Sequence, residues 1–536
     1  MNSKLLIVLS VFLAPLMLHA QGTLETEEVD VIRDYNPILA DAVKVTINGE
    51  VLPASDSVGE LTYSMPVVFY QAPYSPIKIK PVALSKTPQD ELSLNYLKAG
   101  FGTQFTPLGE VYINSNRSDK FQYGLAARYT SSNGSRENQR YSDLDVDGRS
   151  KFYIKKEYVI PVNLFYRNDI VHYYGYNEDS ISFPKDSVRQ RYNRFGFDLG
   201  LANLKENDLD VDFNISGGVK GVQDLAGYRQ LNPWLDLTAD KELKKHHTTG
   251  AGLNIDYFDY NGLQPYYNSF TTLALRYNIE EEGWSVHASL GNTVSSDSKY
   301  YAVPDVDFSK DLVGDKLVFI AGIDGQLQRN NYYTLTEENP FLADSIEIRP
   351  TSRYELYGGI RASTSGNLSF SAKGYYTPFE DMVFFVNQSA DSLRFIPLYG
   401  DGTMAGVAVE LGYFVPDRIG FSAALNAFTF SELSNVAEAW HTPNLTWRLG
   451  TDYHFNSKLT AAAELYGLGK MPALLADGTT SELKGTIDVN LSAVYRYNNL
   501  FNIFLEVNNI AGIKYERYLN YPSYGFNMLG GLSFSF

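Results

Sequence analysis

The sequence predicts an all-β protein, a transmembrane antiparallel β-barrel of about 22 strands. The first reason is that apolar and polar residues alternate strictly in segment after segment between Leu92 and Phe536. The second is that short polar turns and long loops follow one another between these segments. The third is an aromatic content of 14%, with 40 Tyr and 31 Phe, because tyrosine suits the membrane–water interface. Together the three patterns indicate strands that cross a bilayer.

The beginning of the chain, residues 1–20, has the features of a signal peptide. Lys4 supplies a positive charge, an apolar run extends from Leu5 to Leu18, and Ala20 is a small residue suited to cleavage. No later segment offers about 18 consecutive apolar residues, as a transmembrane helix requires. An exported chain without such a helix enters a bilayer only as a closed barrel. We therefore expect a barrel in the cell outer membrane of a Gram-negative bacterium.

Residues 21–91 differ from the rest of the chain because they are rich in proline. The prolines are Pro37, Pro53, Pro66, Pro73, Pro76, Pro81 and Pro88. Proline at this density opposes regular strands and helices. We expect a periplasmic N-terminal segment, which either folds back, partly extended, into the barrel mouth or forms a disordered lead-in. The transmembrane β-barrel then occupies residues 92–536.

Within the barrel region, the alternating segments begin weakly and become clear from Phe121 onward. The predicted short turns are 116–120, 205–208, 280–283, 365–367, 416–418, 456–458 and 498–499. The predicted long loops are 131–142, 173–189, 330–350, 378–403, 431–441, 470–482 and 511–524. Outer-membrane barrels place short turns on the periplasmic side. Counting strands back from Phe536 under that rule gives about 22 strands and places both barrel ends on the periplasmic side.

The last region, residues 484–536, contains three strands with the clearest alternation. The first of these strands places on one face Ile487, Val489, Leu491, Ala493, Tyr495 and Tyr497. A soluble sandwich would alternate in the same way, but aromatic residues near the strand ends favour a lipid-facing girdle. The opposite faces carry Asp488, Arg496 and Glu506, which suit a wet lumen. We expect Phe534 and Phe536 to form the C-terminal signal that barrel-insertion machinery reads.

Several short motifs near the C-terminus carry a family resemblance. They are Glu506-Val507-Asn508-Asn509-Ile510, Lys514-Tyr515-Glu516, Tyr521-Pro522, Gly525 and His441-Thr442-Pro443-Asn444-Leu445. These motifs resemble the last strands and loops of TonB-dependent outer-membrane receptors. The resemblance implies solute binding or uptake across the outer membrane, with TonB as a partner.

A second resemblance lies near the N-terminus. The stretch is Val31-Ile32-Arg33-Asp34-Tyr35-Asn36-Pro37. It is similar to the N-terminal segment of Bacteroidota barrels that resemble TonB-dependent receptors in the barrel alone. TonB-dependent receptors carry a globular plug, but residues 21–91 are too few for one and lack plug-like Arg-Gly and Asp-Gly pairs. A TonB-box-like stretch is formed by Glu28, Val29, Asp30 and Val31. The missing plug leaves an alternative function open, a non-enzymatic barrel subunit of a larger outer-membrane assembly or secretion complex.

Two stretches suggest metal binding and are better explained by structure. Asp143 to Gly148 begins like a calcium loop, but the twelfth position requires Glu and holds Ile154. We expect a strand with lumen-facing aspartates. His246 and His247 are neighbours, and neighbours on a strand point to opposite faces, so the pair belongs to a solvated turn. No metal site or cofactor is predicted.

The tyrosines at the start of two long loops are candidates for ligand contact. Tyr173-Tyr174-Gly175-Tyr176 and Tyr332-Tyr333 could stack on sugar rings, but we favour an outer aromatic girdle extended above the membrane. No Gly-x-Ser-x-Gly motif is present, and no catalytic residue or enzymatic activity is predicted.

Composition limits the partners further. A formal net charge of −17 opposes nucleic-acid binding, because the phosphate backbone demands basic clusters. The absence of cysteine excludes disulfides and thiolate metal sites. The expected partners are outer-membrane lipid, the barrel-insertion machinery, and TonB or other outer-membrane subunits.

Overall fold

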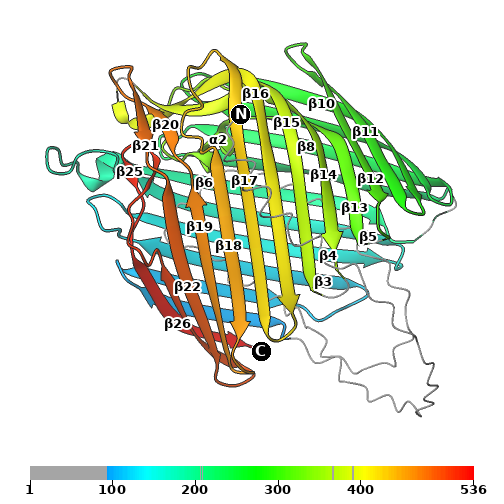
Figure 1. Ribbon diagram of the computed structural model, residues 1–536, viewed down its shortest axis with the longest axis horizontal. Coiled ribbons are helices and arrows are strands. Elements are labelled where there is room, and N and C mark those ends of the chain that lie inside the picture. The colour runs from blue at the N-terminus through cyan, green and yellow to red at the C-terminus, as the bar shows by residue number, and fades with distance from the viewer. Residues whose placement is uncertain (1–92, 206, 208, 315, 365–366, 389–390) are drawn as a thin grey trace, which may run out of the picture. The chain divides into compact units, whose positions relative to one another are not determined.

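The computed structural model describes residues 93–536, apart from positions 206, 208, 315, 365–366 and 389–390. The predicted signal peptide, residues 21–91 and the TonB-box-like residues Glu28 to Val31 lie outside the described residues. The described chain forms one 22-stranded antiparallel sheet. β1 pairs with β2 on one side and with β26 on the other, so the sheet closes into a barrel (Figure 1). The predicted fold class is confirmed.

The barrel strands follow one another around the ring in chain order. They are β1 (Asn95–Gly102), β2 (Thr106–Asn114), β3 (Phe121–Ser132), β4 (Tyr141–Ile154), β5 (Tyr158–His172), β6 (Arg189–Asn203), β7 (Val211–Gln223), β8 (Arg229–Lys244), β9 (His247–Asn261), β10 (Tyr266–Glu281), β11 (Trp284–Ser295), β12 (Tyr300–Asp311), β13 (Leu317–Gln328), β14 (Thr351–Ser363), β15 (Leu368–Gln388), β16 (Asp391–Val415), β17 (Ile419–Ser434), β18 (Leu445–His454), β19 (Leu459–Leu468), β22 (Thr486–Arg496), β23 (Phe501–Asn508) and β26 (Asn527–Ser535).

Smaller elements lie in the connections. They are η2 (Lys185–Val188), α2 (Tyr332–Glu338), the hairpin of β20 (Met471–Leu474) with β21 (Thr480–Leu483), and the pair β24 (Glu516–Tyr518) with β25 (Tyr521–Pro522). Figure 1 shows α2, β20, β21 and β25 together at one end of the barrel. We call this the long-loop end, and the opposite end, which holds the C-terminus, the short-turn end. Within the described chain, no helix is long and apolar enough to cross a membrane.

The outward face of the barrel is apolar and its inward face is polar. On β10, Leu273 and Leu275 are 50% and 56% exposed on the outside. Arg276 of the same strand faces the lumen, where its guanidinium pairs with Asp240 of β8 at 2.9 Å. A broad apolar face does not persist in contact with water, and this alternation is that of a barrel that spans a bilayer.

Glycines let large side chains fold over the neighbouring strand. Gly467 on β19 stands opposite Trp447 on β18, and a Cβ atom there would lie 2.3 Å from the indole. Gly196 on β6 stands opposite Phe165 on β5, where a Cβ atom would lie 2.1 Å from the ring. Each aromatic ring therefore occupies space that any other residue on the partner strand would fill.

One predicted loop, 378–403, is wrong, because β15 and β16 continue as a paired hairpin through this stretch. Their pairing runs on from Met382 opposite Gly400 to Asn387 opposite Phe395. A bulge after Phe379 shifts the alternation, and Phe384, Phe385 and Val386 are then buried in a row. A strand buried on both faces loses the period-2 pattern, so the sequence resembled a loop.

Candidate functional site

Several of the long connections at the long-loop end pack into one hydrophobic core. Its buried members are Val171, Tyr173, Tyr174, Val188, Tyr192, Val222, Tyr260, Tyr332, Tyr333, Leu335, Phe341, Leu342, Ile346, Ile348, Phe385, Phe395, Tyr518 and Tyr521. These residues come from strands and loops spread around the ring, from β5 to the connection between β23 and β26. Loops from different sides of a ring meet only by crossing its opening. We call residues 173–188, 329–350, 383–388, 393–398, 435–444 and 509–526 the loop cap.

The helix α2 lies at the centre of the loop cap and begins with strong local signals. The Asn331 side chain accepts a hydrogen bond from the Thr334 backbone amide, and the Thr334 hydroxyl accepts one from the Asn331 backbone amide, which completes a capping box. The first backbone amide of the helix, that of Tyr332, donates to the Gln230 side chain of β8 at 2.7 Å. The Tyr332 hydroxyl donates to Asp224 at 2.7 Å. The helix is therefore fixed to the barrel wall at its N-terminus.

Aromatic contacts join the connection between β13 and β14, residues 329–350, which we call the central loop, to the other loops. Phe341 stacks on Tyr521, with ring centres 3.9 Å apart and planes 28° from parallel. Tyr174 meets the same Tyr521 ring edge-on at 4.8 Å. Three connections that lie far apart in sequence thus share one aromatic cluster, which contributes offset-stacking and edge-to-face energy beyond the burial itself.

Backbone pairing adds a second link between the central loop and the β15–β16 hairpin. Leu342 forms a parallel bridge with Phe395, and the Ala343 amide donates to the Phe395 carbonyl at 2.8 Å. Beside this bridge, Arg394 pairs with Asp344 at 2.5 Å. The central loop is therefore tied to the hairpin tip through its backbone as well as through its side chains.

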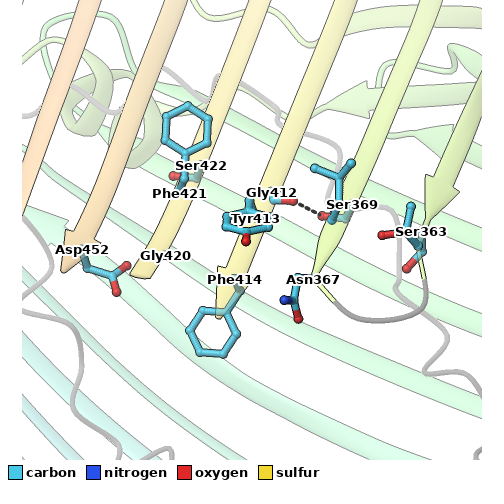
Figure 2. Close-up of a pocket in the computed structure, with 12 residues that line it drawn as sticks. Ser363, Asn367, Ser369, Gly412, Tyr413, Phe414, Gly420, Phe421, Ser422 and Asp452 are labelled. Atoms are coloured by element: carbon cyan, nitrogen blue, oxygen red, sulfur yellow. Dashed lines mark hydrogen bonds between the residues drawn. The ribbon is translucent and has the colours of Figure 1, made fainter. Parts of the chain in front are cut away.

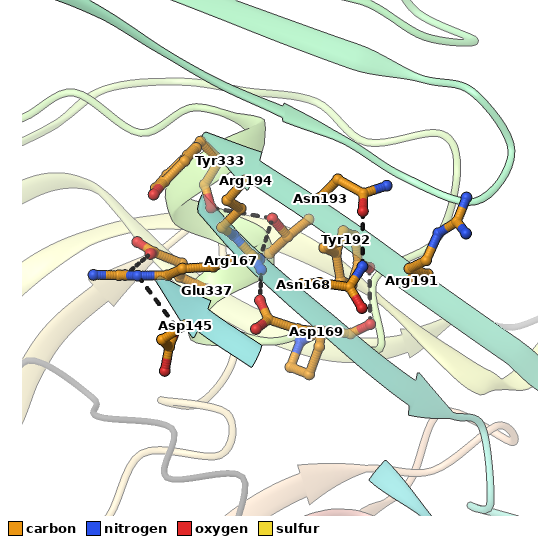
Figure 3. A network of polar contacts seen from close by, with 12 residues as sticks. Asp145, Arg167, Asn168, Asp169, Arg191, Tyr192, Asn193, Arg194, Tyr333 and Glu337 are labelled. Atoms are coloured by element: carbon orange, nitrogen blue, oxygen red, sulfur yellow. Dashed lines mark hydrogen bonds and ion pairs between the residues drawn. The ribbon is translucent and has the colours of Figure 1, made fainter. Parts of the chain in front are cut away.

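A polar network holds the underside of α2 to strands β4, β5 and β6 (Figure 3). Arg194, which is 2% exposed, binds Asp169 through one terminal nitrogen and donates to the Thr336 hydroxyl at 3.1 Å through the other. Arg167 lies between Asp145 of β4 and Glu337 of α2, at 3.5 Å from each. Paired arginines of this kind give geometric specificity, so they hold the helix in one position against the lumen wall.

Two titratable groups of the loop cap have displaced pKa values. His441 hydrogen-bonds the Phe385 carbonyl through Nδ1 at 2.7 Å and accepts from the Leu519 amide at Nε2 at 3.1 Å. Burial lowers the pKa of His441 to about 4, so the ring is neutral with its proton on Nδ1. Burial raises the pKa of Glu338 to about 7, against the opposing effect of Arg517. The cap thus holds a neutral histidine and a readily protonated carboxyl.

The tyrosines that the sequence placed in an aromatic girdle lie elsewhere, so that interpretation is wrong. Tyr173, Tyr174, Tyr176, Tyr332 and Tyr333 are all buried, and all but Tyr176 belong to the core of the loop cap. Their burial also removes the sugar-stacking interpretation, because their faces are covered by protein. The sequence signal that could have placed Tyr332 and Tyr333 is the capping pattern that precedes the helix, Asn-x-x-Thr.

The other sequence-predicted residues lie in ordinary structural places. Asp143 to Gly148 belong to β4, as expected for a strand, and Ile154 ends it. His246 is in the turn between β8 and β9, as expected for the histidine pair, and His247 begins β9. Among the described residues, no group of three or more His, Asp or Glu side chains is placed to hold a metal ion.

The C-terminal phenylalanines lie at the seam where the barrel closes. Phe534 pairs with Leu97 of β1 and with Phe501 of β23, and its ring lies 5.1 Å from that of Phe536. The Phe536 amide donates to Asn95 at 3.0 Å. Phe534 therefore lies on the closing strand and Phe536 follows its last residue, and their use as an insertion signal stays a prediction.

A shallow depression of about 320 Å³ lies at the short-turn end, between the turn after β14 and strands β15 to β18 (Figure 2). It forms where Ser369, Gly412, Gly420 and Ser422 present little side-chain volume. Asp452 is the one titratable carboxyl in its lining. The depression offers no convergent set of catalytic groups.

Comparison with known proteins shows that solved structures share this fold. No protein-family model and no curated protein sequence matches this chain. The FrpB iron transporter from Neisseria meningitidis matches with a TM-score of 0.66 at 11% identity, over 82% of this chain and 81% of that chain. The siderophore receptor PirA from Acinetobacter baumannii gives 0.66 at 11%, over 84% and 81%. The ferric-catecholate import receptor Fiu from E. coli K12 gives 0.63 at 12%, over 84% and 83%. The described chain therefore has the barrel fold of these transporters and receptors.

Proposed function

We propose that this chain is an outer-membrane barrel that binds a solute or takes it up across the outer membrane, in the manner of TonB-dependent receptors. The observation that carries the proposal is a 22-strand barrel whose long-loop end is covered by its own loop cap. Barrels of about this width leave a lumen that side chains do not fill. A wide lumen behind a folded cap fits gated passage of a solute.

The orientation follows from the loops. We place the long-loop end outside the cell and the short-turn end in the periplasm, as in other outer-membrane barrels. The barrel begins at Asn95 beside Phe536, at the short-turn end, so residues 21–91 would enter the periplasm after cleavage of residues 1–20. Glu28, Val29, Asp30 and Val31 would there meet TonB, and Phe534 with Phe536 would direct insertion.

The proposal is one of transport without a chemical step. The structurally similar proteins are described as transporters and receptors, and their iron and siderophore cargoes make ferric chelates the first solutes to test. The contacts that close the cap are aromatic, polar and non-covalent, so they can open reversibly.

Conductance across a planar bilayer tests the proposal with four forms of the mature chain. The first is intact, the second lacks residues 21–91, the third replaces 330–349 with a four-residue turn, and the fourth combines both changes. The replacement is feasible because Gln328 and Thr351 are paired neighbours on β13 and β14, so a short hairpin can join them.

Each outcome has a distinct meaning. We expect the intact barrel to be silent and the doubly altered barrel to conduct steadily. Conductance in the second or third form alone identifies the N-terminal segment or the loop cap as the sole barrier. An intact barrel that conducts steadily is an open pore, and a doubly altered barrel that stays silent has no passage. Either of these two results would overturn gated uptake.

A further inference from the structure

The outward face of β6 changes character at the long-loop end. Phe195, Phe197 and Leu199 alternate along the outside of the strand and are 39%, 39% and 48% exposed. The same outward row continues toward the long-loop end through Asn193 to Arg191 and Arg189. Because successive outward residues lie about 6.6 Å apart along a strand, these arginines stand directly above the lipid-facing band. That height is where lipid headgroups begin.

A third arginine belongs to the same outward surface. Asn193 on β6 pairs with Gln223 on β7, and Gln223 pairs with Arg229, the first residue of β8. Arg229 is exposed, and Leu231 follows it on the same outward face. Two strand spacings and two residues along the strand place the Cα atoms of Arg191 and Arg229 about 12 Å apart. Their long side chains can therefore reach one doubly charged headgroup.

These three arginines differ from the arginines of the lumen because their charges are not neutralised. Within the described chain, no ion pair or side-chain hydrogen bond joins Arg189, Arg191 or Arg229 to a carboxylate, although Asp259 lies on the neighbouring strand. Figure 3 shows the Arg191 side chain directed away from the Arg194–Asp169 network.

Two buried nitrogen atoms beside this surface also lack partners. The Nε atom of Arg191 has no hydrogen-bond partner, nor has the Nε2 atom of His172, which is paired with Arg189 across β5 and β6. The corresponding outward positions at the ends of β10 and β12 hold Tyr267 and Tyr300, as in an ordinary aromatic girdle. The arginine surface is therefore a local feature of β6 and β8.

We propose that Arg189, Arg191 and Arg229 bind the phosphate groups of an anionic glycolipid in the outer leaflet of the outer membrane. The planar guanidinium presents two parallel N–H donors that match phosphate oxygens. A lipid is the source because the arginines continue the outward rows of lipid-facing residues on β6 and β8 and stand at the edge of the apolar band. This inference rests on the proposed membrane location and is independent of solute uptake.

Native mass spectrometry of the full mature chain tests the proposal with diphosphorylated lipid A as the probe. The variant Arg189→Gln with Arg191→Gln and Arg229→Gln removes the three charges. The matched control removes three charges at the short-turn end, through Lys205→Gln, Lys244→Gln and Lys245→Gln. A third variant with lysine at the three arginine positions keeps the charge and loses the planar fork. Heat-modified migration on a gel confirms that each barrel is folded.

We expect the wild type and the short-turn control, with Lys205, Lys244 and Lys245 changed to glutamine, to retain lipid A. The variant with the three arginines changed to glutamine should bind lipid A at least about tenfold more weakly. The lysine-for-arginine variant should fall between them, and lipid A without phosphates should bind weakly to every form. Equal retention by the glutamine variant overturns the proposal, as does equal binding of dephosphorylated lipid A. Displacement of lipid A by millimolar inorganic phosphate would identify a free-anion site instead. Displacement by an acidic peptide would identify a protein-docking surface.

Discussion

Substitution of Phe341 by alanine tests whether the loop cap is the element that closes the barrel. Phe341 is 1% exposed and packs against Tyr521, Tyr174 and Tyr173, which belong to two other connections. Removal of a buried phenylalanine side chain costs about 3–5 kcal/mol, because it loses both burial and packing. The substitution destabilises only the closed cap, because the Phe341 ring is already in water when the cap is open. At about 1.4 kcal/mol for each factor of ten, the opening equilibrium rises by about 10²- to 4 × 10³-fold.

Hydrogen exchange of the backbone amides in residues 332–348 measures this opening free energy directly. Faster exchange should be accompanied by brief conductance openings in a planar bilayer. The matched control is Phe105→Ala, in the turn between β1 and β2, where the side chain is 66% exposed and packs outside the cap. Unchanged exchange in Phe341→Ala would refute the reasoning, as would an equal acceleration in Phe105→Ala.

Three further predictions concern the network, the titratable groups and the barrel wall. Arg194→Lys should speed amide exchange in α2, because lysine lacks the planar fork whose two separate nitrogens reach Asp169 and Thr336. Unchanged exchange would mean that the network does not hold the helix in place. Glu338 has a pKa raised to about 7, so its contribution to the stability of the closed cap is full below about pH 4.5 and is lost as pH rises to 7. His441 has a pKa lowered to about 4, so its contribution is full above about pH 6.5 and is lost as pH falls to 4. The two pH dependences of cap stability oppose one another, so cap opening in the wild type should vary little between about pH 4.5 and 6.5. Amide exchange should show that the Glu338→Gln cap opens more on acidification and the His441→Asn cap opens more as pH rises, each by up to about 1.4 kcal/mol per pH unit. Identical exchange profiles in the wild type and both variants would exclude these opposing contributions. Gly467→Ala should lower the yield of folded, heat-modifiable barrel, because its Cβ atom would meet the Trp447 ring, and the double change with Trp447→Leu should restore it; a normal yield in Gly467→Ala alone would show that the ring moves aside.

The barrel itself could be predicted because its signals are local. A lipid-facing strand needs only an alternation of apolar and polar residues, and Ile487 to Tyr495 or Leu273 to Tyr277 display it without reference to any other part of the chain. The turn between β10 and β11, at residues 282–283, follows from polar residues and a glycine, and Gly283 adopts a positive φ of 81° there. Strand number and direction then follow from counting.

The loop cap could not be predicted in the same way. Its residues have no common period, and they are joined by contacts across long stretches of sequence, such as the Tyr518 hydroxyl on the Glu338 carbonyl and the Tyr521 hydroxyl on the Leu393 carbonyl. A tyrosine at the end of a strand suits an interfacial girdle and a buried loop core equally well, because its ring is apolar and its hydroxyl polar.

The amino-acid sequence by itself therefore determined the barrel, its lipid face and the short turns, because each depends on neighbours along the chain, whereas the predicted loop 378–403 proved to be paired strand. The tertiary structure alone decided that Tyr332 and Tyr333 are buried in the core of the loop cap and that Arg189, Arg191 and Arg229 share one outward surface. Both features depend on which strands and loops the closed ring brings together, and that depends on contacts between residues far apart in the sequence.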